Sequence, residues 1–134
     1  MREYKFRIDF LPPSVNKLYL TNFHTRQRYM SKDGSHFKMA IKLACPPMKF
    51  SKDTPFLDVF ISYHSPKWFN KNGTIKKIDG MNMDKVVFDA ISERIGIDDS
   101  AVFYWSGRKI IDTEEYTEII VKEIESSLKE GCKE

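Results

Sequence analysis

Residues 4–10 and 57–63 alternate apolar with polar or charged side chains. This period of two predicts β-strands that bury one face. The pair Pro12-Pro13 ends the first strand, because proline has no N–H to donate to a strand ladder. Two later strands are expected near Val102–Ser106 and Glu118–Ile124.

Two other segments show the spacing of an amphipathic helix. Residues 35–44 predict a short helix that stops before Pro46. The clearest helix is expected from Met83 to Arg94, with Asn82 as its N-cap and Gly96 as its end. The stripe that this helix should bury consists of Met83, Val86, Val87, Ala90 and Ile91.

The connections between these elements differ in length. Residues 16–32 are polar and are expected to form a loop with an irregular hairpin. Residues 64–78 form a polar connection that is long for a compact domain, which favours a functional role. Trp68 and Phe69 within it either stack on bases or anchor the loop.

The order of strand, hairpin, helix, strand, helix, strand and strand predicts an α+β fold with a mixed sheet and two main helices packed on it. We expect a single domain over residues 1–124, followed by a polar tail over residues 125–134.

Charge is distributed unevenly along the 134 residues, although the net charge is only +3. Residues 1–78 contain 15 Lys and Arg against 5 Asp and Glu, whereas residues 79–134 contain 7 against 14. A basic half beside an acidic half suggests a polyanionic partner such as nucleic acid. The alternative is that charges separated along the sequence mix again on the folded surface.

The two cysteines, Cys45 and Cys132, are far apart and show neither a disulfide framework nor zinc-ligand spacing. Residues 1–7 alternate charged and apolar side chains and do not resemble a signal peptide. No apolar run approaches the roughly 20 residues that a membrane-spanning helix needs. We therefore expect a cytoplasmic protein without a membrane partner.

The stretch from Asp79 to Asp99 combines several acids with a lysine. Mg²⁺ prefers oxygen ligands and typically takes one or two carboxylates together with waters and phosphate oxygens. A nearby lysine would stabilise the negative charge that develops when a phosphodiester is hydrolysed. The alternative is structural, with Asp98-Asp99 forming a turn and Lys85 and Asp89 forming an i,i+4 surface pair.

Spacing alone does not bring these acids together. A helix of about 12 residues is about 18 Å long. Asp79 and Asp98 flank the predicted helix, so they converge only if one chain end folds back along the sheet.

Three motifs occur in a fixed order along the chain. Pro12-Pro13-Ser14-Val15-Asn16 follows the first strand, and Ser31-Lys32-Asp33-Gly34 precedes a helix. The third motif consists of Asp79, Asn82, Lys85, Asp89-Ala90 and Asp98-Asp99. In this combination, from about Phe6 to about Ile124, the chain resembles the RusA family of Holliday-junction resolvases, phage-type endodeoxyribonucleases that cut four-way DNA junctions. The signature of that family is Asp-x-Asp-Asn-x-x-Lys-x-x-x-Asp-Ala, followed by Asp-Asp.

The resemblance implies a Mg²⁺-dependent endonuclease that hydrolyses phosphodiesters of four-way junctions in DNA recombination and repair. It implies that Asp79 and Asp99 bind Mg²⁺, with Asp98 as a weaker candidate. Lys85 would contact the scissile phosphate or stabilise the leaving oxygen. Asn82 and Asp89 would lie behind these residues, with Asp89 either orienting Lys85 or forming only a surface pair.

The same resemblance suggests which residues contact DNA. Those beside the acidic stretch would bind phosphates, and those in the N-terminal motif would contact the DNA backbone or brace their loop. The set consists of Lys76, Lys77, Arg108, Lys109, Asn16 and Lys17. The resemblance also implies a homodimer, because a four-way junction needs two symmetric cuts and a two-fold dimer supplies two centres at a fixed separation.

One position departs from the family signature. Met81 stands where the family has its second acid, and a thioether is a poor ligand for Mg²⁺. The enzyme could work with Asp79, Asp99 and waters, or a nearby acid such as Asp84 or Asp98 could substitute. The third reading is a degenerate relative that binds branched DNA without cutting it. Asp84 falls at a variable position of the signature, so we expect it to face solvent.

Overall fold

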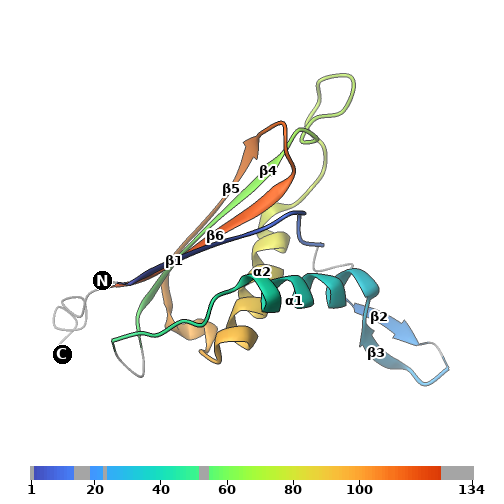
Figure 1. Cartoon of the computed structure of the whole chain (residues 1–134). Helices are drawn as coiled ribbons and strands as arrows, with labels where there is room; N and C mark the ends of the chain where they lie inside the picture. Colours follow the sequence, from blue (N-terminus) through green and yellow to red (C-terminus); the bar gives the residue numbers. More distant parts are fainter. Residues whose placement is uncertain (1, 14–18, 23, 52–54, 125–134) are drawn as a thin grey trace, which may run out of the picture.

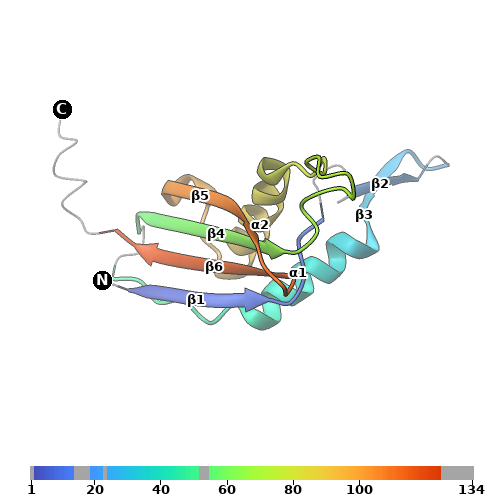
Figure 2. The ribbon, with the colours of Figure 1, turned by 90° about the horizontal axis from the view of Figure 1, so that it is seen from above.

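A four-stranded mixed sheet with two helices packed on one side forms the framework of the computed structural model (Figures 1 and 2). The structure describes residues 2–13, 19–22, 24–51 and 55–124. Its elements, in chain order, are β1 (Glu3–Ile8), β2 (Tyr19–Asn22), β3 (Gln27–Met30), α1 (Lys32–Ala44), β4 (Leu57–Ser65), α2 (Gly80–Ile95), the 3₁₀ turn η2 (Asp99–Ala101), β5 (Val102–Ile111) and β6 (Tyr116–Glu123).

The strands of the sheet lie in the order β1-β6-β4-β5. The pairs β1–β6 and β6–β4 are antiparallel, whereas β4 and β5 are parallel and are connected through α2. β2 and β3 form a separate hairpin that projects beyond the start of α1 (Figure 1). The predicted α+β class, mixed sheet and two helices are confirmed, and the expected hairpin is present.

The alternating segments form strands as predicted, with shifted ends. β1 ends at Ile8 rather than Phe10, and β5 continues to Ile111 rather than ending at Ser106. Residues 107–111 show no alternation that would reveal a strand. They are extended because they pair with β4, with Gly107 opposite Ile61. Since β5 is an edge strand, most of its side chains remain exposed.

Side-chain caps set the start of both helices. Ser31 Oγ accepts a hydrogen bond from Gly34 N at 3.1 Å, so α1 begins three residues earlier than expected. The N-cap of α2 is Asp79 and not Asn82, so that prediction was wrong. Gly96, with a left-handed φ of 70°, ends α2 as predicted. Neither of the two helices described is long and apolar enough to cross a membrane.

One core lies between the sheet and the helices. The predicted apolar stripe of α2 is buried in full and packs with Phe37 and Ile41 of α1. The sheet contributes alternate residues, among them Val59, Ile61 and Ile119. Cys45 is buried and free of a disulfide, whereas Cys132 lies outside the described residues.

The long connection after β4 is anchored by Trp68. This side chain is only 4% exposed, and its indole Nε1 donates to the carbonyl oxygen of Ile110 at 2.8 Å. The backbone N–H of Lys76 in turn donates to the carbonyl oxygen of Trp68. Trp68 therefore anchors the loop, which is one of the two roles expected for it. These contacts also hold the segment that leads to α2. Phe69 is half exposed.

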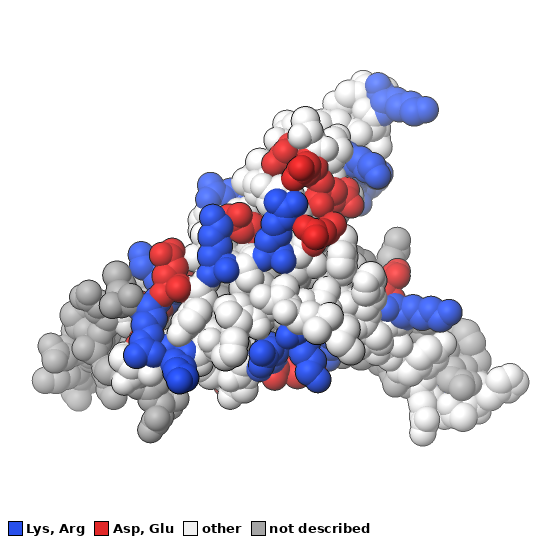
Figure 3. Space-filling model, viewed as in Figure 1, with Lys and Arg blue, Asp and Glu red and all other residues white. Residues whose placement is uncertain are grey.

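The basic and acidic halves of the sequence mix in the fold. Figure 3 shows Lys and Arg side chains interspersed with Asp and Glu on one face of the molecule. Lys5 pairs with Glu118 at 3.6 Å, and Lys38 pairs with Glu93 at 2.6 Å. Both pairs join the first half to the second, so the uneven distribution along the sequence does not by itself create two charged faces.

Replacing Gly96 with alanine is expected to lower the free energy of unfolding by about 1 kcal/mol, because a residue with a Cβ pays roughly that amount in a left-handed conformation. Gly80→Ala is the matched control. Its Cβ would meet only Lys109 Cε at 3.8 Å, and Gly80 begins a helix without a left-handed φ, so alanine should not destabilise the fold there. Urea unfolding measures both variants, and equal destabilisation of the two would contradict this account of the helix end.

Candidate active site

Asp79 is fixed at the start of α2, where its side chain caps the helix. Its Oδ1 accepts a hydrogen bond from the backbone N–H of Met81 at 3.0 Å, which satisfies one of the donors that a helix start leaves unpaired. The preceding backbone is held from β5, because Lys109 Nζ donates to the carbonyl oxygen of Ile78. Asp79 is exposed, but hydrogen bonds fix its side chain and the backbone just before it.

Asp84 lies further along α2 and is half-buried, so the expectation that it faces solvent was wrong. The hydroxyl of Tyr63, a fully buried residue of β4, donates a hydrogen bond to Asp84 Oδ1. A Cβ at Gly107 of β5 would lie 2.5 and 2.6 Å from the two carboxylate oxygens of Asp84. Asp84 is half-buried because its carboxylate fills the space that the missing side chain of Gly107 leaves free.

The environment changes the acidity of both partners. Burial raises the pKa of the Asp84 carboxyl, the hydrogen bond from Tyr63 opposes this rise, and the charge of Asp79 adds to it. Burial and the same hydrogen bond raise the pKa of the Tyr63 hydroxyl. Tyr63 thus stays protonated and remains a donor at neutral pH.

Two adjoining cavities lie between α2 and β5, and Met81 and Asp84 line both. We call the first the capping cavity; it has a volume of about 260 Å³ and is lined by Tyr63, Asp79, Gly80, Met81, Asp84, Gly107, Arg108 and Lys109. We call the second the lysine groove; it has a volume of about 380 Å³ and is lined by Met81, Asp84, Lys85, Phe88, Asp89, Asp99, Val102 and Trp105. The chain therefore folds back so that Asp99 lies beside α2.

Asp98 and Asp99 have different surroundings although they are neighbours in sequence. Asp98 caps the turn η2, where its Oδ2 accepts a hydrogen bond from Ser100 Oγ at 3.0 Å, and it lines a different cavity. Hydrogen bonds from Asp99 and Ser100 lower the pKa of Asp98. The contact with Asp98, with the charge of Asp89 as a smaller cause, raises the pKa of Asp99. Of the two, only Asp99 reaches the lysine groove.

Lys85 is exposed and lines the lysine groove. Among the described residues, the structure gives its ammonium neither an ion pair nor a hydrogen bond. The surface pair of Lys85 with Asp89, one of the two alternatives for Asp89, is not seen: in the described part of the chain no ion pair joins them within 4.0 Å. Asp89 acts instead on Asp99 through its charge.

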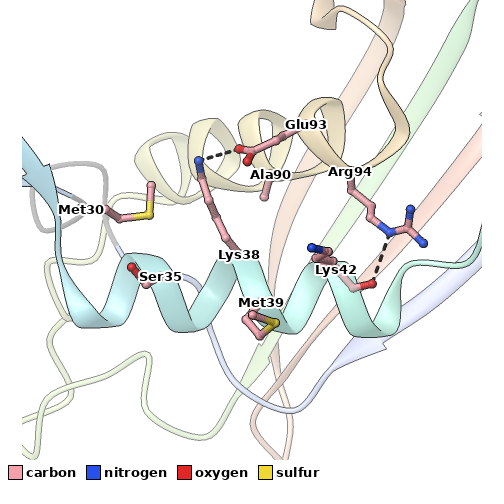
Figure 4. A pocket seen from close by; sticks show the side chains of 8 residues that line it. All are labelled: Met30, Ser35, Lys38, Met39, Lys42, Ala90, Glu93 and Arg94. Carbon is pink, nitrogen blue, oxygen red and sulfur yellow. Dashed lines mark hydrogen bonds and ion pairs between the residues drawn. The ribbon is translucent and has the colours of Figure 1, made fainter.

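A further cavity of about 390 Å³ lies between α1 and α2 (Figure 4). Among the described residues that line it, the one acid is Glu93, which is paired with Lys38. Arg94 Nε donates to the carbonyl oxygen of Lys42 at 3.2 Å. The described lining therefore offers a metal ion no carboxylate that lacks a cationic partner.

A family model of the endodeoxyribonuclease RusA matches residues 9–122, a range that contains both the capping cavity and the lysine groove. The chain belongs to the RusA family of endodeoxyribonucleases. Membership implies the nuclease activity of a Holliday-junction resolvase. A search of curated proteins gave no match.

RusA-family resolvases are metal-dependent nucleases. Within residues 2–13, 19–22, 24–51 and 55–124, no three His, Cys, Asp or Glu side chains are placed to hold a metal ion. Asp84 instead feels the charge of one neighbouring acid, Asp79, whereas Asp99 interacts mainly with Asp98 and more weakly with Asp89. Since Mg²⁺ often takes only one or two carboxylates and completes its shell with waters and substrate phosphates, a pair fits Mg²⁺ although it does not form an all-protein cage.

The other candidates from the RusA signature and its flanks are dispersed. Asn82 is half-buried and lines neither cavity. Lys76 and Lys77 are exposed just before Asp79. Arg108 lines the capping cavity and lies over the ring of Phe60 at 4.0 Å, whereas Lys109 also stacks on Trp68 at 5.2 Å. Asn16 and Lys17 lie outside the described residues.

Sequence reasoning missed Tyr63 and Gly107 in this RusA-family site. Tyr63 looked like an ordinary apolar position of a strand, and Gly107 lay beyond the predicted end of its strand. Only the parallel pairing of β4 with β5, which places Gly107 opposite Ile61 and Lys109 opposite Tyr63, brings them to Asp84. No local signal in the sequence could have revealed that pairing.

Asp84→Asn is expected to raise the melting temperature of the metal-free protein at pH 7, because it removes a half-buried charge and keeps an oxygen acceptor for Tyr63. Because the pKa of Asp84 is raised in the folded protein, the folded state binds this proton more tightly than the unfolded chain does. The charged form therefore destabilises the fold above that pKa, and the penalty disappears as the pH falls through it.

The advantage of the Asp84→Asn variant should therefore shrink between pH 7 and about pH 4. Thermal unfolding followed by circular dichroism at both pH values measures this change. The control is Asp89→Asn, an exposed position of the same helix, which should change the melting temperature little. An Asp84→Asn variant that is less stable than the wild type at pH 7 would contradict the account.

Proposed function

We propose that the protein is a Mg²⁺-dependent, structure-specific endonuclease that resolves four-way DNA junctions by hydrolysing phosphodiesters. The observation that carries this proposal is the position of Lys85 and Asp99 in one groove, with Asp79 in the adjoining cavity, in a chain of the RusA family. The family membership supports the substrate class, and the two cavities support the location of the chemistry.

In this proposal, Asp79 in the capping cavity and Asp99 in the lysine groove would be the residues that hold Mg²⁺. When bound, the ion lowers the pKa of a water ligand and polarises the phosphodiester. The helix cap and the Lys109 contact keep Asp79 in a defined orientation, which limits the reorganisation needed when substrate arrives. Asp98 lines neither the capping cavity nor the lysine groove, so we assign it no ligand role.

Lys85 then acts on the phosphate. Its ammonium lies in the groove without a partner among the described residues, so it is available to an oxygen that becomes more negative as the phosphodiester breaks. The carboxylates of Asp89 and Asp99 line the same groove and favour a bound cation. In this proposal, Lys85 contacts the phosphate in addition to the metal ion.

DNA binding would use the basic residues around the capping cavity. Lys76, Lys77 and Arg108 are exposed on adjacent segments, and Lys109 adds a partly engaged ammonium. Because each phosphate contact releases counterions from DNA, affinity should fall steeply with salt. A homodimer would present two such sites and supply the two cuts that a four-way junction requires.

A second candidate is a relative that binds junctions without cutting them. Met81, in the place of the second family acid, favours it, because its side chain is 79% exposed and offers no charged oxygen. Nicking assays on a four-way junction with and without Mg²⁺ separate the two candidates. Binding without nicking by the wild type, with nicking gained in Met81→Asp, would favour this second candidate.

Asp79→Asn should reduce nicking of a four-way junction by about 100-fold or more, because it removes a charged ligand. Asparagine caps helices as well as aspartate does, so folding and junction binding should be unchanged. Glu93→Gln, on the side of α2 that faces α1, is the control and should nick normally. Removal of Mg²⁺ by a chelator should likewise stop nicking but not binding. Normal nicking by Asp79→Asn would contradict the assignment.

Lys85→Met should lower the nicking rate by about 100-fold, because the developing negative charge loses its cation. The matched control, Lys42→Met, removes the same charge from the cavity between α1 and α2 and should nick at the wild-type rate. Single-turnover rates measured at saturating enzyme separate this effect from weaker binding. Equal losses in both variants would show that only the overall charge matters.

A further inference from the structure

Asp84 occupies the boundary between the two cavities of the site. It lines the capping cavity together with Asp79 and the lysine groove together with Asp99. Met81 is the only other described residue that lines both cavities, and its thioether is a poor Mg²⁺ ligand. Among the described residues, Asp84 is therefore the acid that lines the cavity of each proposed metal ligand.

The carboxylate of Asp84 is supported like a metal ligand. Its Oδ1 accepts a hydrogen bond from the buried Tyr63 hydroxyl, whereas no donor among the described residues reaches its Oδ2. The carboxylate of Asp79 has the same arrangement. Its Oδ1 accepts a hydrogen bond from the backbone N–H of Met81, and no donor in the described part of the chain reaches its Oδ2. Ligating carboxylates are commonly oriented by such outer hydrogen bonds, which leave one oxygen for the ion.

The backbone of β5 also fits this position to a carboxylate. Gly107 provides the space for Asp84, since a Cβ there would come within 2.6 Å of both carboxylate oxygens. A purely structural partner for Tyr63 would not need a charged group at the edge of two open cavities. Burying part of a charge costs folding free energy, which a cation beside it would offset.

We propose that Asp84 replaces the acid missing at Met81 and supplies a carboxylate oxygen to Mg²⁺ beside Asp79. This inference rests on the proposed function, because it assumes that the site binds a divalent cation. Tyr63 is then a positioning residue that orients the Asp84 carboxylate, and Gly107 is the position that makes room for it.

Binding of Mn²⁺ to the full chain without DNA tests the inference independently of activity. Mn²⁺ is an octahedral, oxygen-preferring substitute for Mg²⁺, and the loss of the electron paramagnetic resonance signal of free Mn²⁺ reports its binding. Asp84→Asn should weaken Mn²⁺ binding at least about tenfold, and Tyr63→Phe by about tenfold. Glu93→Gln, which removes an acid elsewhere on α2, should bind as the wild type does.

A second variant guards against loss of binding through misfolding. Adding Met81→Asp to Asp84→Asn returns a carboxylate to the family position, and Met81 lines both cavities, so the double variant should recover most of the lost affinity. Melting curves accompany each titration. Asp84→Asn is expected to melt higher than the wild type, so weaker binding together with a higher melting temperature supports a ligand role.

The outcomes separate this inference from the proposed function. Wild-type affinity in Asp84→Asn, with binding lost in Asp79→Asn, would overturn the role of Asp84 and leave the nuclease proposal in place. If the wild type binds no Mn²⁺ and the single variant Met81→Asp gains binding, the role of Asp84 is overturned and the non-cutting relative is favoured. If neither the wild type nor Met81→Asp binds Mn²⁺, the role of Asp84 and the metal-dependent function are both overturned.

Discussion

Parallel pairing between β4 and β5 requires the chain to cross from one end of the sheet to the other, and α2 makes that crossing. The rest of the site depends on this constraint. It places the N-terminus of α2 beside the middle of β5, where Lys109 holds the backbone before Asp79 and Gly107 makes room for Asp84. It also returns the chain to η2, so that Asp99 lies beside the same helix.

The site concentrates negative charge on a scaffold that only partly neutralises it. The charge of Asp79 raises the pKa of Asp84, and the contact with Asp98, with a smaller effect from Asp89, raises the pKa of Asp99. Such an arrangement is unfavourable for the isolated fold and favourable once a divalent cation and a phosphate are present. Although Met81 is uncharged, carboxylates therefore line both cavities of the site.

The sequence allowed the strands, the second helix and the family to be predicted, because alternation, helical spacing and motif order are local signals. The buried stripe of α2 and the stop at Gly96 were confirmed. The start of α2 at Asp79 was missed, since Asp79 and Asn82 are both good caps and only the structure decides between them. The burial of Asp84 was predicted wrongly, because it depends on Tyr63 and on a glycine of another strand.

The most direct test of the account is the position of a divalent cation in crystals of the full chain grown with Mn²⁺, located by its anomalous scattering. The account predicts a peak within ligand distance of carboxylate oxygens from both Asp79 and Asp84, at the boundary of the capping cavity and the lysine groove. A peak bound only at Asp98, or bound between α1 and α2, would contradict it.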